Sequence, residues 1–185
     1  EISKKNIRIS YAGRILEDKG ILWLIAAYKV AKAKYPNLEL YIAGPLDEKN
    51  PSRISKNYFK ELIDFKDIYF LGNIKNIKKY WQESDIAILL SKREGLPLSL
   101  LEAASTGRPI ISTDVTGSRE IAINDYNSIN IKLGNIKECS NAILKLSKNK
   151  TLRKKYGKNS RKLVEGNMAL EHINYQYYSL YKAMI

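Results

Sequence analysis

Cysteine, histidine and proline are scarce in this sequence of 185 residues, which has one cysteine, one histidine and five prolines. The single Cys139 cannot form a disulfide within the chain, so we expect a small core thiol in a reducing compartment. The single His172 lies in the tail, where we expect it to be structural, and no histidine and aspartate cluster indicates a metal site. No run approaches the roughly 18 apolar residues that cross a bilayer, so the sequence predicts no membrane-spanning helix.

Acidic residues are also few: 19 Asp and Glu stand against 32 Lys and Arg, a net charge of +13. Such a charge fits nucleic acid, anionic lipid or a phosphorylated ligand as partner. The lysines are scattered, with only short runs such as KNIKK and KNKTLRKK, and Asn and Ile are abundant too. We therefore attribute most of the charge to compositional bias, although a positive field would help to attract a phosphorylated substrate or hold the protein near acidic lipid.

Short apolar runs alternate with longer amphipathic stretches along the chain. The short runs predict strands over 7–13, 38–44, 68–72, 85–91, 109–114 and 128–132. The stretches between them predict helices over 20–35, 57–65, 77–84 and 96–106, with two or three more from 135 onward. This alternation predicts an α/β fold, a Rossmann-like parallel sheet of about six strands with helices on both faces and a C-terminal helical tail. Residues 1–185 read as one domain, and the abrupt start on a strand suggests a fragment of a longer protein.

The loop after the first strand suits a diphosphate, because such sheets bind ligands beyond the carboxyl ends of their strands. In GRILEDKG, Gly13 and Arg14 follow the strand, and Lys19 and Gly20 open the next helix. Glycine lets the backbone approach a ligand, and the two cations add positive potential. The alternative is a surface turn with solvated cations. Gly44 and Gly72 end the next two strands where a side chain would obstruct a ligand, but glycine is common there.

Two carboxylates stand in the segment SKREGLPLSLLEAASTGRPII, residues 91–111. Glu94 precedes a Gly-x-Pro sequence in which Pro97 is expected to be the first helical residue. The free N–H groups around Gly95 and Leu96 should then point to the same edge as Arg14. We expect Glu94 to accept hydrogen bonds from ligand hydroxyls there.

Glu102 lies about a turn and a half inside the same predicted helix. A buried carboxylate without a partner costs several kcal/mol in order of magnitude. Ligand hydroxyls would satisfy it. The alternatives are a polar stripe with Ser99, Ser105 and Thr106, or a pair with a nearby arginine.

The motifs GR…KG, LG, S…EG with a second Glu eight positions on, G.P and TDVTGSRE follow one another from about Ile7 to Glu120. In this order they resemble the C-terminal, nucleotide-sugar-binding half of a GT-B glycosyltransferase, in particular the retaining family 4 (glycosyl transferases group 1) with its E-x7-E motif. AGP at 43–45 departs from relatives, which often have a second glycine. The resemblance implies that the N-terminal acceptor domain is absent from this chain, so that the chain alone binds donor weakly and transfers little.

The resemblance also implies roles for the matching residues. Arg14 and Lys19 would grip the donor diphosphate as it departs, and Glu94 would hold hydroxyls of the transferred sugar, which makes these three the candidate catalytic residues. Glu102 would bind the ribose hydroxyls. The other implied donor-binding positions are Gly13, Gly44, Gly72, Asn73, Ile74, Gly95, Leu96, Pro97 and Glu120, of which 72–74 would face the base.

The implied reaction is retaining and needs neither a metal nor a cofactor, because the leaving phosphate takes the proton of the acceptor. The expected partners are a UDP- or GDP-sugar, the absent domain, and an anionic membrane at the cytoplasmic face, in bacterial surface polysaccharide synthesis; no nucleic acid is expected. In relatives the final helix packs across the partner domain. Burial of the tyrosine-rich tail, 168–185, on this domain is the alternative.

Two other functions stay open. A GT-B-fold sugar-nucleotide epimerase would bring acid and histidine groups into the cleft, and the strand-end loops here contain no histidine. A non-catalytic basic module for nucleic acid or lipid would need a concentrated basic face or interleaved aromatic and basic residues, and the sequence shows neither. Binding that falls steeply with salt, without preference for sugar nucleotides, would favour the basic module.

Overall fold

The computed structural model describes residues 6–166 and 168–184. Six strands form one parallel sheet in the order β3-β2-β1-β4-β5-β6. They are β1 (Ile7–Ala12), β2 (Leu38–Ala43), β3 (Ile68–Gly72), β4 (Ile86–Leu89), β5 (Ile110–Thr113) and β6 (Ser128–Ile131). The strand order reverses between β1 and β4, which creates the crevice where doubly wound sheets bind ligands. The predicted strands and the Rossmann-like class are confirmed.

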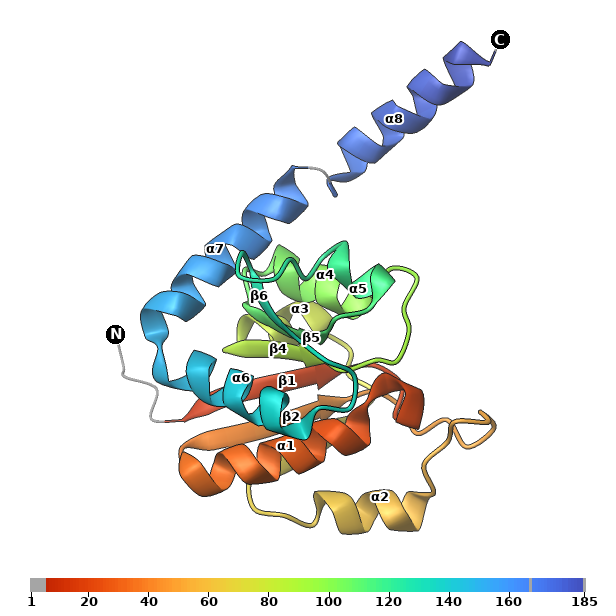
Figure 1. Ribbon diagram of the computed structural model, residues 1–185. Coiled ribbons are helices and arrows are strands. Elements are labelled where there is room, and N and C mark those ends of the chain that lie inside the picture. Colours follow the sequence, from red (N-terminus) through yellow and green to blue (C-terminus); the bar gives the residue numbers. More distant parts are fainter. Residues whose placement is uncertain (1–5, 167, 185) are drawn as a thin grey trace.

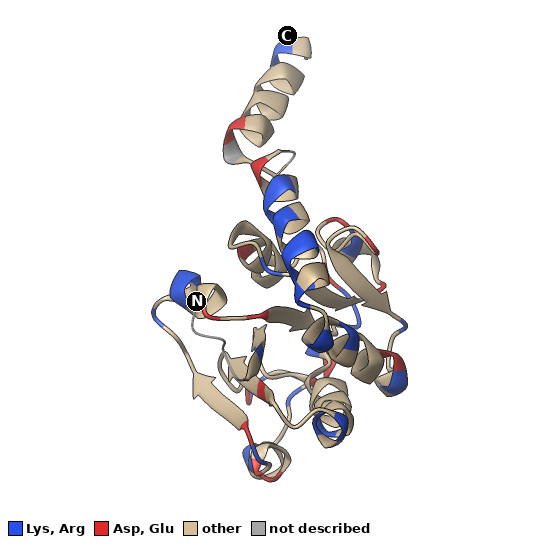
Figure 2. Ribbon diagram, turned by 90° about the vertical axis from the view of Figure 1, so that its left-hand side faces the viewer, with Lys and Arg blue, Asp and Glu red and all other residues tan. Residues whose placement is uncertain are grey.

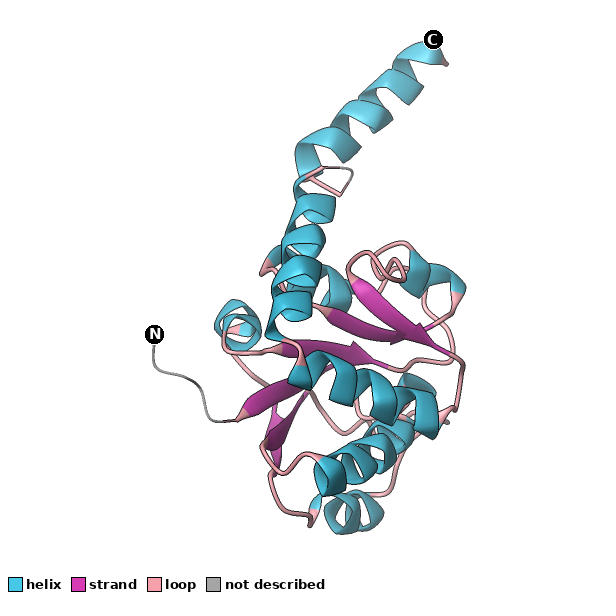
Figure 3. Cartoon of the chain, turned by 60° about the vertical axis from the view of Figure 1, so that its left-hand side comes forward, coloured by secondary structure: helices cyan, strands magenta, loops and turns pink. Residues whose placement is uncertain are grey.

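Helices cover both faces of the sheet (Figures 1 and 3). They are α1 (Ile21–Lys34), α2 (Lys56–Ile63), α3 (Ile77–Gln82), α4 (Leu98–Ser105), α5 (Thr116–Arg119), α6 (Ile136–Lys148), α7 (Lys150–Glu165) and α8 (Leu170–Ala183), with a 3-10 turn η1 (Glu17–Lys19). α1 packs against α6, whereas α3 and α7 pack against α4. The short η1 and α5 were not expected, because elements of three or four residues carry no periodic pattern.

The start of α4 differs from the prediction. The helix begins at Leu98, and Pro97 stands before it in an extended conformation with φ −75° and ψ 97°. The expectation that Pro97 is the first helical residue is therefore wrong. Leu96, as the residue before a proline, is disfavoured from the helical region, which accounts for its own exclusion from the predicted helix over 96–106. Pro97 takes the extended N-cap position itself, so Leu98 becomes the first helical residue.

The central strands are buried on both sides, which is why they read as continuous apolar runs. All four residues of β4 and all four of β5 are buried. Cys139 of α6 is buried as well, and burial raises the pKa of its thiol to about 12. This thiol belongs to the core, as expected, and is inert at neutral pH.

The C-terminal helices leave the body of the domain. α7 still buries Tyr156, Gly157 and Ser160, but α8 projects away from the sheet (Figure 1). Four tyrosines of α8 are between 58% and 69% exposed, so the alternative in which this helix is buried on the domain is wrong. His172 is exposed on α8, with Nε2 3.0 Å from Gln176 Nε2. Among the described residues, no helix is both long and apolar enough to cross a bilayer.

Candidate functional site

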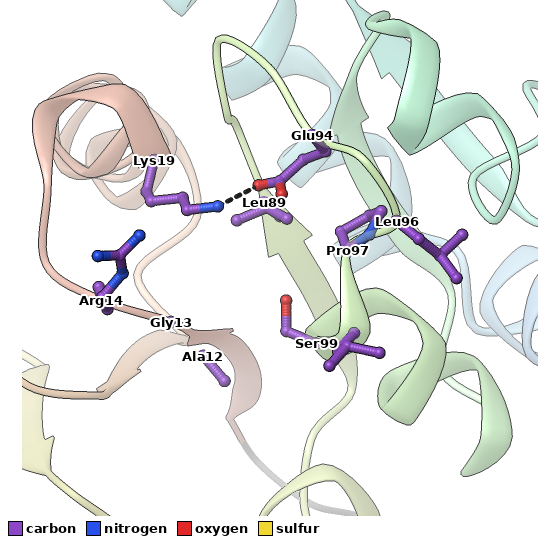
Figure 4. A pocket seen from close by; sticks show the side chains of 10 residues that line it. Ala12, Gly13, Arg14, Lys19, Leu89, Glu94, Leu96, Pro97 and Ser99 are labelled. Carbon is purple, nitrogen blue, oxygen red and sulfur yellow. Dashed lines mark hydrogen bonds and ion pairs between the residues drawn. The ribbon is translucent and has the colours of Figure 1, made fainter.

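A cavity of about 270 Å³ opens at the carboxyl ends of β1 and β4, where the strand order reverses (Figure 4). We call it the switch-point pocket. It is lined by Ala12, Gly13, Arg14, Lys19, Leu89, Glu94, Leu96, Pro97, Leu98 and Ser99. The three candidate catalytic residues therefore lie around one cavity, although they are up to 80 positions apart in the chain (94 − 14).

An ion pair joins the two sides of the pocket. Lys19 Nζ lies 2.7 Å from Glu94 Oε1, and the Glu94 side chain is only 9% exposed (Figure 4). The hydroxyl of Ser91 donates to the same oxygen. Within the described chain, Glu94 Oε2 makes no hydrogen bond, so it can accept one from a hydroxyl of a bound molecule.

Lys19 is held in place by the turn η1. The carbonyl of Asp18 accepts a hydrogen bond from Lys92 N at 2.8 Å, and its carboxylate accepts one from Ser52 Oγ at 2.6 Å. The Lys92 ammonium also lies 3.1 Å from Asp18 Oδ1. The hydrogen bond from Ser52, and after it the one from the Lys92 side chain, lower the pKa of Asp18. Hydrogen bonds thus connect the turn after β1 to the loop after β4, and they fix the positions of these two pocket loops relative to each other.

The backbone of Arg14 is held by a hydrogen bond, whereas its side chain is exposed. The buried Tyr11 hydroxyl donates to Arg14 O at 2.7 Å, and burial raises the pKa of Tyr11, with the charge of Glu94 adding to the effect. The Arg14 guanidinium pairs with Asp47 at 3.0 Å, and its side chain is 53% exposed. A side chain this exposed can turn to meet an anion in the pocket.

Four glycines lie where loops contact each other closely at this edge. A Cβ on Gly44, which has φ +129°, would stand 1.9 Å from Gly13 O. A Cβ on Gly117 would stand 2.2 Å from Glu94 O and 2.1 Å from Gly95 O. Gly44 and Gly117 thus allow the close approach of these loops, and neither Gly44 nor Gly95 lines the pocket, so their donor-binding roles stay predictions. Pro45, in the departing AGP, accepts a hydrogen bond from Ile15 N at 2.9 Å.

Glu102 is not brought into the switch-point pocket. It lies on α4 one turn beyond Ser99, and its Oε2 accepts a hydrogen bond from Trp81 Nε1 at 3.4 Å. A separate cavity of about 240 Å³ contains it together with Ser105, Thr106 and Arg161. This position fits the polar-stripe alternative, and the ribose role stays a prediction.

Four other predicted positions lie apart from the pocket lining. Gly72, Asn73 and Ile74 are at the end of β3, where Gly72 O accepts a hydrogen bond from Gly44 N at 2.7 Å. Glu120 follows α5 and is exposed. Their donor-binding roles stay predictions.

Ser91 belongs to the S…EG motif, but sequence reasoning assigned no role to its side chain, which is fully buried. Its hydroxyl bonds Glu94, and its carbonyl accepts a hydrogen bond from Thr113 Oγ1 at 2.6 Å. The signal was a serine at a strand end three residues before the glutamate. Serine is too common after strands for that spacing alone to reveal a contact.

Two further cavities adjoin the pocket. One of about 320 Å³ shares Arg14 and Lys19 with it and reaches Asn50 and Arg93. Another, of about 450 Å³, shares Glu94 and reaches Asp114 and Arg119. Three neighbouring cavities with both cationic and acidic side chains on their walls therefore lie along the carboxyl edge.

The strand order and the pocket at its reversal define the chain as a Rossmann-like domain, and the family match assigns this domain to the GT-B glycosyltransferase class. The chain belongs to the family "Glycosyl transferases group 1", whose sequence model matches residues 1–163. The resemblance to this class is thereby confirmed.

The chain is similar in sequence to curated glycosyltransferases, of which we give two. The chain is 27% identical over 180 residues to the capsular polysaccharide biosynthesis glycosyltransferase CapM of Staphylococcus aureus, covering 97% of this chain and 47% of CapM. It is 32% identical over 159 residues to N,N'-diacetylbacillosaminyl-diphospho-undecaprenol alpha-1,3-N-acetylgalactosaminyltransferase of Campylobacter jejuni, covering 86% of this chain and 40% of that enzyme. The chain thus spans less than half the length of either relative.

Two solved structures share the fold. The C-terminal domain of the group 1 glycosyl transferase LpcC of Francisella tularensis is 26% identical, with a TM-score of 0.78, covering 89% of this chain and 87% of that one. HepE of Anabaena, solved with UDP and glucose, is 19% identical with a TM-score of 0.84, covering 97% of this chain and 49% of HepE.

Proposed function

We propose that this chain is the donor-binding half of a retaining glycosyltransferase that takes a sugar from UDP or GDP. The observation that carries the proposal is the switch-point pocket, in which Arg14 and Lys19 face Glu94. HepE, which shares the fold, holds UDP and glucose. The likeness to LpcC supports a C-terminal domain.

The proposed chemistry follows from the charges. Arg14 and Lys19 stabilise the diphosphate as the bond from the sugar carbon to its phosphate oxygen breaks. The acceptor oxygen bonds that carbon on the same face, and its proton passes to the leaving phosphate. Glu94 and the backbone at Leu96 hold the sugar, so the protein supplies positioning rather than a nucleophile, and neither metal nor cofactor is required.

The proposed acceptor is a glycan or a lipid-linked sugar at the cytoplasmic face of a membrane, in surface polysaccharide synthesis. CapM is named for capsular polysaccharide biosynthesis, and the name of the Campylobacter enzyme contains a sugar linked to diphospho-undecaprenol. The acceptor site would lie in a second domain. α8 supports this, because Tyr177, Leu180 and Tyr181 form an exposed apolar stripe that fits such a domain.

The first test is a thermal-shift and calorimetry panel of UDP, GDP, ADP and their common sugar conjugates. A nucleotide at about a hundred times its Kd should stabilise the fold by roughly 2.7 kcal/mol. For a domain of this size that raises Tm by about 5–10 °C. We expect nucleotides of only one base to bind. The double variant Arg14→Ala with Lys19→Ala should show no rise in Tm with that nucleotide. Lys34→Ala, on exposed α1 surface, is the matched control and should keep it.

The same panel tests the role of Glu102. Glu102→Ala should lose nucleotide binding if the carboxylate holds the ribose. It should keep nucleotide binding if Glu102 only belongs to the polar stripe of α4 and accepts the hydrogen bond from Trp81. Nucleotide binding retained without Arg14 and Lys19, or no binding to folded protein, would overturn the proposed site.

A further inference from the structure

The basic residues are less scattered in space than along the sequence. α7 holds seven Lys and Arg and one Glu within 16 residues, a net charge of +6 (7 − 1), of the +13 of the whole chain. Bands of Lys and Arg repeat along this helix in Figure 2. The sequence-based expectation of no concentrated basic face is therefore wrong, because residues three and four apart in KNKTLRKKYGKNSRK share one side of a helix.

Six of these cations lie on one side of α7. At 100° per residue they span an arc of about 140°. They are Lys150, Lys154, Lys155, Lys158, Arg161 and Lys162, and all are exposed. The opposite side buries Tyr156, Gly157 and Ser160. We call the six residues the α7 basic face.

Little within the domain neutralises this face. Glu165 pairs with Arg161 at 2.6 Å, but no described residue forms an ion pair with Lys154, Lys155 or Lys158. Lysines four residues apart repel each other along a helix and destabilise it. Packing against α4 keeps the helix formed despite this repulsion, so the face presents uncompensated charge that an anionic partner would relieve.

A cavity of about 240 Å³ lies at the first turn of α7, large enough for a phosphate group. Arg108, Lys150, Arg153 and Lys154 line it, against one carboxylate, Asp85. The two guanidinium groups are anchored: Arg108 Nη1 donates to Ser84 O at 2.7 Å, and Arg153 Nη1 donates to Leu146 O at 2.6 Å. The lysines are the movable cations at its rim.

This cavity is remote from the donor pocket. Asp85 precedes β4 and Pro109 precedes β5, so the cavity opens at the amino edge of the sheet. The switch-point pocket opens at the carboxyl edge, after β1 and β4. A partner on α7 therefore leaves the switch-point pocket open.

We propose that the α7 basic face docks on an anionic lipid bilayer, with the cavity receiving a lipid phosphate at its end. The choice of lipid rests on the proposed function, in which the acceptor can be lipid-linked. The face suits a flat surface with spread-out negative charge, such as a bilayer of anionic lipids. Five of its six cations are lysines, which act as point charges and lack the bidentate geometry of arginine. Its 16-residue helix is about 24 Å long.

The test is sedimentation with vesicles of phosphatidylglycerol and phosphatidylcholine at low and moderate salt. The variant is Lys154→Gln with Lys155→Gln and Lys158→Gln, since glutamine retains helix propensity. Each lysine near an anionic surface contributes roughly fivefold in partition, so we expect the triple variant to bind about 100-fold more weakly. Phosphatidylcholine vesicles alone should bind neither protein.

The matched control is Lys56→Gln with Lys60→Gln and Lys66→Gln, three exposed lysines on and after α2 that remove the same charge. It should keep vesicle binding. Equal losses in both triple variants, no binding to anionic vesicles, or tighter α7-dependent binding of a random DNA duplex would each overturn the proposal.

The nucleotide panel separates this proposal from the donor site. The α7 triple variant should show the same nucleotide shift as the parent chain. Vesicle binding without nucleotide binding would overturn only the donor site, and nucleotide binding without vesicle binding would overturn only the α7 docking face.

Discussion

At the scale of single residues, the nearly buried Glu94 determines how much positive charge the pocket can offer to a ligand. A carboxylate that is only 9% exposed needs donors, and here Lys19 and Ser91 both contact Oε1. A bound diphosphate would attract the same Lys19. Donor binding therefore has to share that ammonium between two anions. Arg14, whose guanidinium is exposed and pairs with Asp47 at the surface, is the group that can turn to add charge.

Gly20 provides a prediction at this scale. It has φ +72°, and a Cβ there would stand 2.1 Å from Leu90 O. Both the backbone conformation and the space exclude a side chain, so Gly20→Ala should lower the free energy of unfolding by about 2–4 kcal/mol. Urea unfolding measures the loss.

Gly72→Ala is the matched control for Gly20→Ala. Gly72 also has positive φ, +59°, but nothing lies within 4 Å of the added Cβ. Its cost should be only the conformational one, about 1–2 kcal/mol. Equal losses at the two positions would show that contact with Leu90 contributes nothing.

At the scale of elements, the crossing of α4 and α7 decides where the basic face points. Ser160 Oγ donates to Arg108 O at 2.7 Å, just after α4. A Cβ on Gly157 would stand 2.3 Å from Gly107 O. The backbones thus touch through two glycines, which turns the opposite side of α7, with its lysines, to solvent.

Gly157→Ala should therefore destabilise the protein, although alanine has a higher helix propensity than glycine. Alanine in a helix interior is ordinarily better than glycine by about 1 kcal/mol. Here overpacking against Gly107 should give a net loss of about 1–3 kcal/mol. Lys158→Ala, on the exposed side of the same turn, should be near neutral in the same urea titration. Stabilisation by Gly157→Ala would show that the two helices can separate at no cost.

At the scale of the whole molecule, the two edges of the sheet are separate surfaces. The carboxyl edge carries the switch-point pocket, and the amino edge carries the cavity beside α7. α8 leaves both of them and extends away from the domain (Figure 1). The domain core contains Ile9, Ile88 and Ile143, and among the described residues none from α8 belongs to it.

Removal of α8 should leave the domain folded. A chain ending at Gly166 should have a Tm within about 2 °C of the parent, because the side chains of Tyr175, Tyr178 and Leu180 are more than half exposed. Differential scanning calorimetry measures this. A large fall in Tm would show that α8 packs on this domain in solution.

The local pattern of the sequence determined the six strands, most helices and the grouping of Arg14, Lys19 and Glu94 at one edge. The reason is that parallel βα repeats place every strand end on the same side, so loops can be grouped without knowing the contacts. The same reasoning placed Glu102 on α4, since helical periodicity follows from spacing.

Only the tertiary structure decided which of these residues meet. Glu102 pairs with Trp81 from α3, and Ser91 with Glu94, because side-chain contacts depend on packing between elements rather than on spacing within one. The basic face likewise exists only because Gly157 packs α7 against Gly107 and leaves its lysines outside. Periodicity specifies which residues share a side of a helix, whereas packing specifies which side is covered.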